Sequence, residues 1–357
     1  MYGYSGKILH IDLTTRKTWV ETKPEAWYKV YIGGVSMAAR LLWENIKPGC
    51  EPLSPDNPIC IANGIFAGTP VPVGGKYGLA SKSPLTGFMG DSLSGSWFPV
   101  ALKRTGWDGI VIHGASAEWV NVFIDDGRVM FRDARKLLGK GTFETEEAIR
   151  EELLDDQVRS ATIGPAGENL VRFANVTNDG RQAGRTGHGA VWGSKKLKAV
   201  SVRGTKGVVV ADPDTLMKMS FDITEQAQGP YTVKYRMLGT ATNVLNMNKL
   251  GLLPTRNYQQ GTFEMAEQVS GEYLEEHFKV KKIACAQCPI ACEQVSAATQ
   301  GMYAGAMTGI EYECLYANGP NLGIGDLNAV IKLIDVADRG GQDAMSQGVT
   351  ISWAMES

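Results

Sequence analysis

Short strands are predicted over the first 210 residues, because apolar and polar side chains alternate there in brief runs separated by turns. Two antiparallel hairpins stand out. One joins residues 7–12 to 18–21, and the other joins 120–124 to 128–132 around an Asp-Asp-Gly turn. Further strands are predicted at 58–62, 109–113, 170–176, 199–202 and 208–210.

Helical periodicity occurs twice within this part, at 35–46 and 143–154, and it dominates after residue 210. Asp212 and Pro213 make a good helix start, with Asp as the N-cap and Pro in the first turn. Further helices are predicted at 240–250, 270–278 and 326–338, and another begins within 348–357. We therefore expect an α+β protein, with a β-rich domain over 1–210 and a mainly helical domain over 211–357. No internal repeat is visible in the sequence.

Composition narrows the class of protein. The chain has 36 Lys plus Arg against 38 Asp plus Glu, a net charge of -2, so it lacks the positive field that attracts nucleic acids or anionic membranes. With 43% hydrophobic residues it is an ordinary globular protein, and no apolar run approaches the ~20 residues of a membrane span. Residues 1–10 do not form a secretory signal, which predicts a cytoplasmic protein.

Three of the six cysteines form the sharpest chemical signal. Cys285, Cys288 and Cys292 follow the spacing C-x2-C-x3-C, and in a reducing compartment such close thiols indicate an iron–sulfur cluster or zinc. Zinc is the weaker alternative, because no second Cys or His pair accompanies them. The plain alternative is a set of ordinary buried cysteines. A fourth cluster ligand is either a residue other than cysteine, a thiol outside this chain, or a thiol at an unfamiliar spacing: Cys50, Cys60 or Cys314.

Two polar segments are candidates for ligand binding. The stretch 178–195 contains five glycines with Arg181, Arg185 and Lys195, which suits an anion such as phosphate, although glycine-rich loops are often surface turns. Its glycines do not fit the dinucleotide-binding G-x-G-x-x-G pattern. Residues 74–95 combine glycines, hydroxyls and Lys82, and suit either a polar ligand or a turn-rich connection.

A pair of carboxylates completes the candidates. Glu311 and Glu313 flank Tyr312, and could act as general acids or bases if they were buried beside a reacting centre. Two glutamates in a loop are more often simply solvated.

Together, seven segments resemble the tungsten-containing aldehyde:ferredoxin oxidoreductase family. They occur in the family's order from the first residue to the last. The segments are MYGY at 1–4 with GKIL at 6–9, KSPLTG at 82–87, IGPAGENL at 163–170, NDG at 178–180, AVWGSK at 190–195, the three cysteines, and EYE at 311–313.

The resemblance implies a fold and a set of cofactors. The N-terminal domain, 1–210, would consist of two similar β-rich halves under a bis-pterin tungsten or molybdenum centre, and 211–357 would be a truncated helical domain beside a [4Fe-4S] cluster. Cys285, Cys288 and Cys292 would bind three irons of that cluster. Glu313 matches the glutamate that acts as an acid or base near the metal.

The resemblance also assigns residues to the pterin. Lys76, Gly95, Gly184 and Arg185 would contact its phosphates, and the backbone carbonyls of Leu93 and Ala183 would face a bridging Mg²⁺. Asp338 and Asp343 belong to a pterin-contacting motif in which this chain has Gln342 where the family has Leu. The family often has Arg at 76 and Asn at 93, and its loop around Ala183 is usually one residue longer. Lys76 keeps the charge but loses the two-pronged geometry of arginine.

The implied activity is oxidation of aldehydes to carboxylic acids, with ferredoxin as the electron acceptor. Some family members instead reduce aromatic thioesters. The family has a further C-terminal half, which carries the fourth cluster cysteine and most of the substrate channel. The chain is therefore expected to be a truncated member, or an electron-transfer half that is completed by a second polypeptide; a homodimer is a further alternative.

Overall fold

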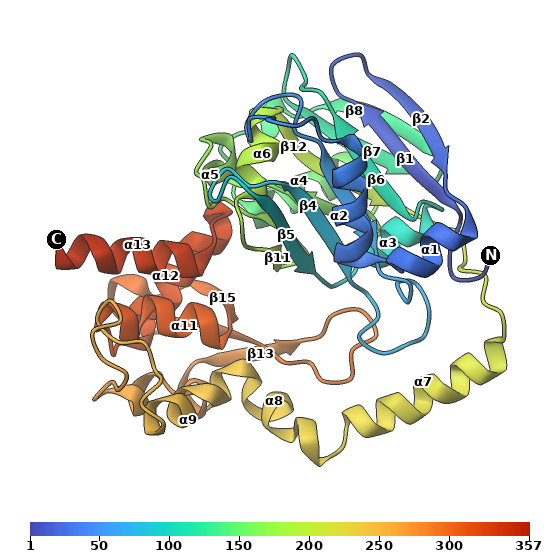
Figure 1. The fold of residues 1–357 in the computed structure, drawn as a ribbon. Coiled ribbons are helices and arrows are strands. Elements are labelled where there is room, and N and C mark those ends of the chain that lie inside the picture. The colour runs from blue at the N-terminus through green and yellow to red at the C-terminus, as the bar shows by residue number, and fades with distance from the viewer. The chain divides into compact units, whose positions relative to one another are not determined.

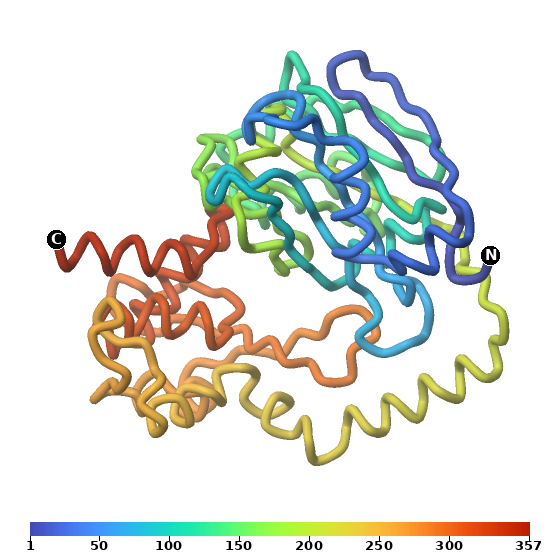
Figure 2. The backbone as a smooth tube through the Cα atoms, in the orientation of Figure 1, coloured from blue at the N-terminus to red at the C-terminus, as the bar shows by residue number.

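The computed structural model describes residues 1–357, which divide into two compact units. The first unit contains Met1–Phe221 together with Cys285–Gln287 and Gly340–Gln342, and the second contains the remainder. Figure 1 labels the elements of each unit and Figure 2 traces the backbone through them. Helices account for 39% of the residues and strands for 23%, as the α+β prediction requires.

Two six-stranded sheets form most of the first unit. Sheet A has the order β2-β1-β6-β3-β4-β5 and sheet B has the order β8-β7-β12-β9-β10-β11. The strands of sheet A are β1 (Lys7–Asp12), β2 (Lys17–Thr22), β3 (Ile59–Asn63), β4 (Tyr77–Lys82), β5 (Met89–Ser94) and β6 (Gly109–His113). Those of sheet B are β7 (Val120–Asp125), β8 (Arg128–Asp133), β9 (Arg159–Thr162), β10 (Val176–Asn178), β11 (Arg181–Ala183) and β12 (Leu197–Arg203).

The two sheets share one topology. In each, the first two strands form a hairpin, the first strand pairs in parallel with the sixth, and the remaining neighbours are antiparallel. The six strands of sheet B therefore repeat those of sheet A in the same chain order. This confirms two similar halves, although no repeat is visible in the sequence.

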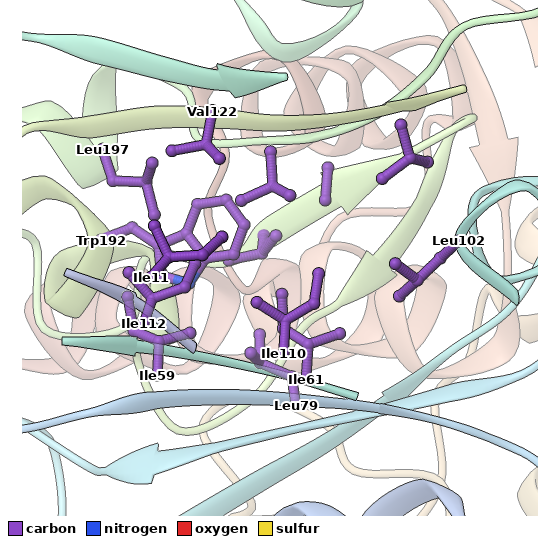
Figure 3. Close-up of a cluster of buried hydrophobic side chains, with 14 of the residues drawn as sticks. Ile11, Ile59, Ile61, Leu79, Leu102, Ile110, Ile112, Val122, Trp192 and Leu197 are labelled. Atoms are coloured by element: carbon purple, nitrogen blue, oxygen red, sulfur yellow. The ribbon is translucent and has the colours of Figure 1, made fainter. Parts of the chain in front are cut away.

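A shared hydrophobic core lies between the sheets (Figure 3). Ile59 and Ile61 of β3 and Val122 of β7 point into it, together with Trp192. Cys60, between the two isoleucines, points to the opposite face of sheet A. Both faces of the central strands are buried, so these strands are nearly continuous apolar runs.

Helices cover the outer faces of the sheets. Helix α2 (Gly34–Asn45) packs Met37 and Leu41 against the outer face of sheet A, and α4 (Thr142–Leu153) packs Ile149 against that of sheet B. The order of layers is therefore helix, sheet, sheet, helix. The other helices of this unit are α1 (Glu25–Tyr31), α3 (Phe98–Arg104), α5 (Pro165–Glu168) and α6 (His188–Ser194).

The second unit combines helices with a small antiparallel sheet of β13 (Lys279–Ile283), β14 (Glu293–Ala297) and β15 (Met307–Ile310). Its core includes Ile310, Leu315, Val330 and Ile334. Helix α7 (Pro213–Ala227) runs from the first unit's range into the second's. The remaining helices are α8 (Val233–Leu238), α9 (Asn243–Lys249), α10 (Gly271–His277), α11 (Tyr312–Asn318), α12 (Leu327–Gly340) and α13 (Ala344–Glu356).

Two predicted strands are wrong in whole or in part. Of 170–176, only the last residue lies in a strand, because Leu170 takes a left-handed φ of 58° and the amides of 170, 171 and 174 bond within local turns. Residues 208–210 pair with no strand, and Val209 is 67% exposed. Strands β4, β5, β9 and β11 of the first unit and β13, β14 and β15 of the second were not predicted. No helix of the structure is long and apolar enough to cross a bilayer.

Candidate cofactor-binding site

Three of the predicted site residues meet at the end of β5. A Cβ atom built on Gly95 would lie 3.0 Å from Nζ of Lys76 and 3.3 Å from Sγ of Cys285, so both side chains face bare backbone there. All three belong to the first unit. An ammonium group and a thiol facing an uncovered peptide suit a ligand with anionic groups and a thiophilic metal nearby.

The edges of the two sheets carry the other residues assigned to the pterin. Strand β5 is the edge of sheet A and β11 is the edge of sheet B, and the two strands are in contact. Leu93 lies on β5, 54% exposed, and Ala183 ends β11, fully buried. The topology therefore brings Leu93 and Ala183, 90 residues apart in the chain, onto neighbouring strand ends.

The glycine-rich segment divides into glycines that pack and one that leaves space. Cβ atoms on Gly187, Gly189 and Gly193 would lie only 2.0, 2.3 and 1.9 Å from the nearest backbone oxygens. Gly184 is different, since its nearest neighbour would be 3.8 Å away. Most of these glycines thus serve close backbone packing, and Gly184 alone of these four leaves room for a ligand.

Arg185 is anchored through its backbone. Its N–H donates to Oγ of Ser92 at 3.2 Å, and the same hydroxyl donates to the Arg185 carbonyl at 3.0 Å. Ser92 alternates along β5 with the exposed Asp91 and Leu93, so it faces inward while they face outward. Sequence reasoning missed this link, and the alternation of small buried and larger exposed residues along 89–94 was the signal for it.

The hydroxyls of the segment 82–87 are used within the protein. Oγ of Ser83 donates to the Thr186 carbonyl at 2.7 Å and accepts from the Thr86 amide at 3.1 Å. Next to it, Ser81 and Thr186 bond to the two ring nitrogens of His188 at 2.8 and 3.1 Å. Burial lowers the pKa of His188 to about 3, so its ring is neutral. The hydroxyls of Ser83 and Thr86 thus take part in local turns and in contacts with the neighbouring segment.

In the second unit, acidic residues surround Cys314. Burial raises the pKa of this thiol well above its usual value, and the carboxylates of Asp338, Glu311, Asp343 and Glu313 raise it further. Cys314 is therefore a thiol rather than a thiolate. These charge effects indicate that the carboxylates of Glu313, Asp338 and Asp343 lie in the neighbourhood of one thiol of this unit.

Each of these carboxylates has a definite position. Asp338 accepts a hydrogen bond from Oγ1 of Thr308, and Asp343 caps α13 by accepting from the Met345 amide at 3.1 Å. Glu313 lies in the first turn of α11 and is exposed. The burial that would favour a role for Glu313 in acid–base chemistry is thus not provided by the residues of this chain.

The cysteine motif lies on an irregular loop. Gln287 and Ala291 take positive φ angles of 57° and 50° within it, and all three cysteines are partly exposed. Cys285 belongs to the first unit, and Cys288 and Cys292 to the second. No three His, Cys, Asp or Glu side chains of the structure lie close enough together to hold a metal ion. The iron–sulfur assignment therefore depends on the donor chemistry of the loop, which suits iron.

Comparison with protein families gives two matches that together cover most of the chain. Residues 8–204 match the model of the N-terminal domain of aldehyde ferredoxin oxidoreductase, and residues 218–357 match the model of its domains 2 and 3.

Individual proteins agree with these matches. Over its whole length the chain is 42% identical to the tungsten-containing aldehyde ferredoxin oxidoreductases of Thermococcus kodakarensis and Pyrococcus abyssi, and it spans 59% of each. It is 30% identical to the WOR-like subunit of an aliphatic sulfonate oxidoreductase of Pyrococcus furiosus, of which it spans 60%.

One solved structure also resembles the chain. The active site complex BamBC of benzoyl coenzyme A reductase, with bound 1,5 dienoyl-CoA, superposes with a TM-score of 0.86 at 27% identity. The match covers 99% of this chain and 56% of that one.

Proposed function

Because this chain belongs to the aldehyde ferredoxin oxidoreductase family, we propose that the protein oxidises aldehydes to carboxylic acids and passes the electrons to ferredoxin. The observation that carries the proposal is the meeting of Lys76 and Cys285 at Gly95, beside the edge strands of the two sheets. A cation and a thiol there fit a ligand with phosphate groups next to a thiolate-bound cluster.

The phosphate contacts would be shared by the two sheets. Lys76 and Gly95 would serve one phosphate from sheet A, and Gly184 and Arg185 the other from sheet B. The open space at Gly184 supports this assignment, because its methyl-free backbone lets an anion approach the peptide.

Further groups of the chain would complete the binding of the cofactors. The carbonyls of Leu93 and Ala183 would face Mg²⁺, an ion that prefers oxygen ligands. Asp338 and Asp343 would contact the pterin, and the thiols at 285, 288 and 292 would hold the cluster. When bound, the tungsten or molybdenum centre takes up two electrons at once, and the cluster releases them singly.

Glu313 would hold the proton that leaves during aldehyde oxidation. Its position at the start of α11 suits a carboxylate, because the positive end of the helix dipole favours negative charge. The exposure of Glu313 in this chain means that its surroundings would be completed by other protein segments. Those segments would come from a further part of the polypeptide, from a second polypeptide, or from a second copy in a homodimer.

A second candidate function is reduction of aromatic thioesters. The resemblance of this fold to the benzoyl coenzyme A reductase complex favours it, at a TM-score of 0.86. The sequence identity to that protein is 27%, against 42% to the aldehyde oxidoreductases. Aldehyde oxidation is therefore the first candidate.

The test begins with the metal content of the natural protein purified without oxygen. We expect tungsten or molybdenum with phosphorus, and about four irons for a [4Fe-4S] cluster. Zinc alone, or no metal, would refute the proposal. In the loaded protein, aldehyde-dependent reduction of ferredoxin would support the first candidate, and turnover of an aromatic thioester instead would support the second.

A further inference from the structure

We propose that Asn178 is a positioning residue for cofactor binding, which acts by fixing the turn that carries Gly95. The inference rests on the proposed function. It concerns a residue of the Asn-Asp-Gly segment to which neither the family resemblance nor the proposed function assigns a cofactor contact.

The side chain of Asn178 holds the end of β5 from the opposite sheet. Its Nδ2 donates to the Gly95 carbonyl at 2.7 Å. Its Oδ1 accepts from Oγ of Ser94 at 2.9 Å and from the hydroxyl of Tyr77 at 3.0 Å. Asn178 ends β10 in sheet B and is fully buried, whereas all three partners belong to sheet A or follow it. Buried amides with three bonds are strongly held in place.

The next residue holds the other end of the same turn. Oδ2 of Asp179 accepts from the amides of Trp97 and Phe98 at 3.0 and 2.9 Å, at the start of α3. The Asp179 amide donates in turn to both carboxylate oxygens of Glu146 at 3.1 Å. Between the two anchors lies Ser96 with φ 80°, a conformation that residues other than glycine adopt only when the surroundings enforce it.

Gly95 has no side chain that could adjust its distance from the neighbouring groups of the candidate site. Only the position of its backbone sets the distance to Lys76 and Cys285, whose polar atoms lie 3.0 and 3.3 Å from where its Cβ would be. A shift of the turn by a few tenths of an ångström would close or widen this space. Asn178 therefore sets the geometry in which Lys76 and Gly95 would meet a phosphate.

The test is the substitution Asn178→Asp in the natural protein, purified without oxygen. The new side chain has the same size and keeps the accepting oxygen, but at alkaline pH it sets a second oxygen against the Gly95 carbonyl. We expect about a tenfold loss of tungsten or molybdenum and of phosphorus per chain, the effect of one buried unmatched polar contact.

The loss should depend on pH more strongly in the variant than in the wild type. A buried carboxyl titrates well above ~4, and in its protonated form it can again donate to the Gly95 carbonyl. Cofactor retention should therefore recover at about pH 6 and fall at about pH 9. The other ionisable groups near this point are the same in both proteins, so a difference between the two proteins belongs to the introduced carboxyl; they are on Lys76, Tyr77, Glu146, Arg159, Asp179 and Cys285.

Asn57→Asp is a matched control. Asn57 is also fully buried, donates to the Pro52 and Lys82 carbonyls at 2.6 and 3.0 Å, and accepts from the Lys82 amide at 2.9 Å. It belongs to no candidate cofactor contact. The control should lose thermal stability like Asn178→Asp but keep its cofactor.

If Asn178→Asp does not fold, a second pair of variants, at Asp179, still tests the inference. Asp179→Asn keeps an oxygen for the Trp97 and Phe98 amides and should retain the cofactor, whereas Asp179→Ala should lose it. Wild-type cofactor content in Asn178→Asp at both pH values, equal losses in Asn178→Asp and Asn57→Asp, or equal content in the two Asp179 variants, would overturn the inference. Absence of tungsten, molybdenum and pterin phosphorus from the wild type would instead overturn the proposed function.

Discussion

Replacement of Gly184 by alanine separates a glycine that leaves room for a ligand from one that serves packing. The φ of Gly184 lies outside the left-handed region, and a Cβ there would meet nothing closer than 3.8 Å. Alanine should therefore fit the unloaded protein, and by restricting the unfolded chain it should stabilise by about 0.4–1 kcal/mol. If a phosphate approaches this peptide, the added methyl group occupies its place.

Gly193 gives the contrasting case within the same segment. Its Cβ would lie 1.9 Å from the carbonyl oxygen of Gly167, so α5 and α6 would have to separate by more than an ångström. Overpacking of this kind costs typically 1–3 kcal/mol, and between two fixed backbones we expect about 3 kcal/mol. That corresponds to a decrease in Tm of roughly 6–12 °C for a unit of this size.

The assay measures two quantities for each variant: Tm of the unloaded protein and the content of tungsten, molybdenum and phosphorus after anaerobic purification. Gly184→Ala should keep or slightly raise the Tm and lose cofactor, whereas Gly193→Ala should lower the Tm. Gly127→Ala, in the open hairpin turn of β7 and β8, should change neither. Wild-type cofactor content in Gly184→Ala would refute the phosphate assignment, and an unchanged Tm in Gly193→Ala would refute the packing argument.

Further predictions concern the proton, the pH and the thiols. Glu313→Gln should abolish turnover in the loaded protein and leave its metal content intact; full activity would remove Glu313 from the reaction. Burial lowers the pKa of His188 to about 3 and of His113 to about 4. In the unfolded chain these histidines titrate near pH 6.5, so below that pH the unfolded state binds more protons than the folded state. The free energy of unfolding should therefore fall below pH ~6.5, by up to about 1.4 kcal/mol per pH unit for each histidine. Urea unfolding at pH 5, 6 and 7 measures this slope, and His188→Gln should reduce it by up to about 1.4 kcal/mol per pH unit; an unchanged slope would contradict the assignment. In metal-free protein, the partly exposed Cys285 should react with iodoacetamide in the folded state. Cys60 is buried in β3 and should react only after unfolding. Equal reaction rates of the two thiols would contradict the burial of Cys60.

The sequence predicted those elements whose local pattern of apolar and polar residues matches the way they are buried in the fold. Strand β1 and the two hairpins alternate clearly, and α2 and α4 lie within one residue of their predicted ranges. Strands β4 and β5 were missed because Gly78, Gly90 and several serines give them little strand propensity. They form strands because sheet A and the opposite sheet bury them, a tertiary effect that no local window contains.

The candidate site was predicted as separate segments, and the structure supplied the links between them. Ser92 with Arg185, and Asn178 with Gly95, are pairs 93 and 83 residues apart that meet where the two sheets touch. Periodicity carries no information on such pairs. The glycines of 187–193 were candidates for ligand binding by composition, and only their neighbours show that they serve packing.

The common topology of the two sheets has an evolutionary consequence. Six strands in one order, followed by six in the same order, are what duplication of an ancestral unit of about a hundred residues would leave. Such an ancestor would have formed a symmetric dimer, in which each copy offered the same strand edge to the same half of a two-fold ligand. Fusion would have released the copies from this constraint, so that the two halves could come to differ, with Lys76 beside one edge strand and Arg185 after the other. The asymmetry of the present site would then be younger than its scaffold.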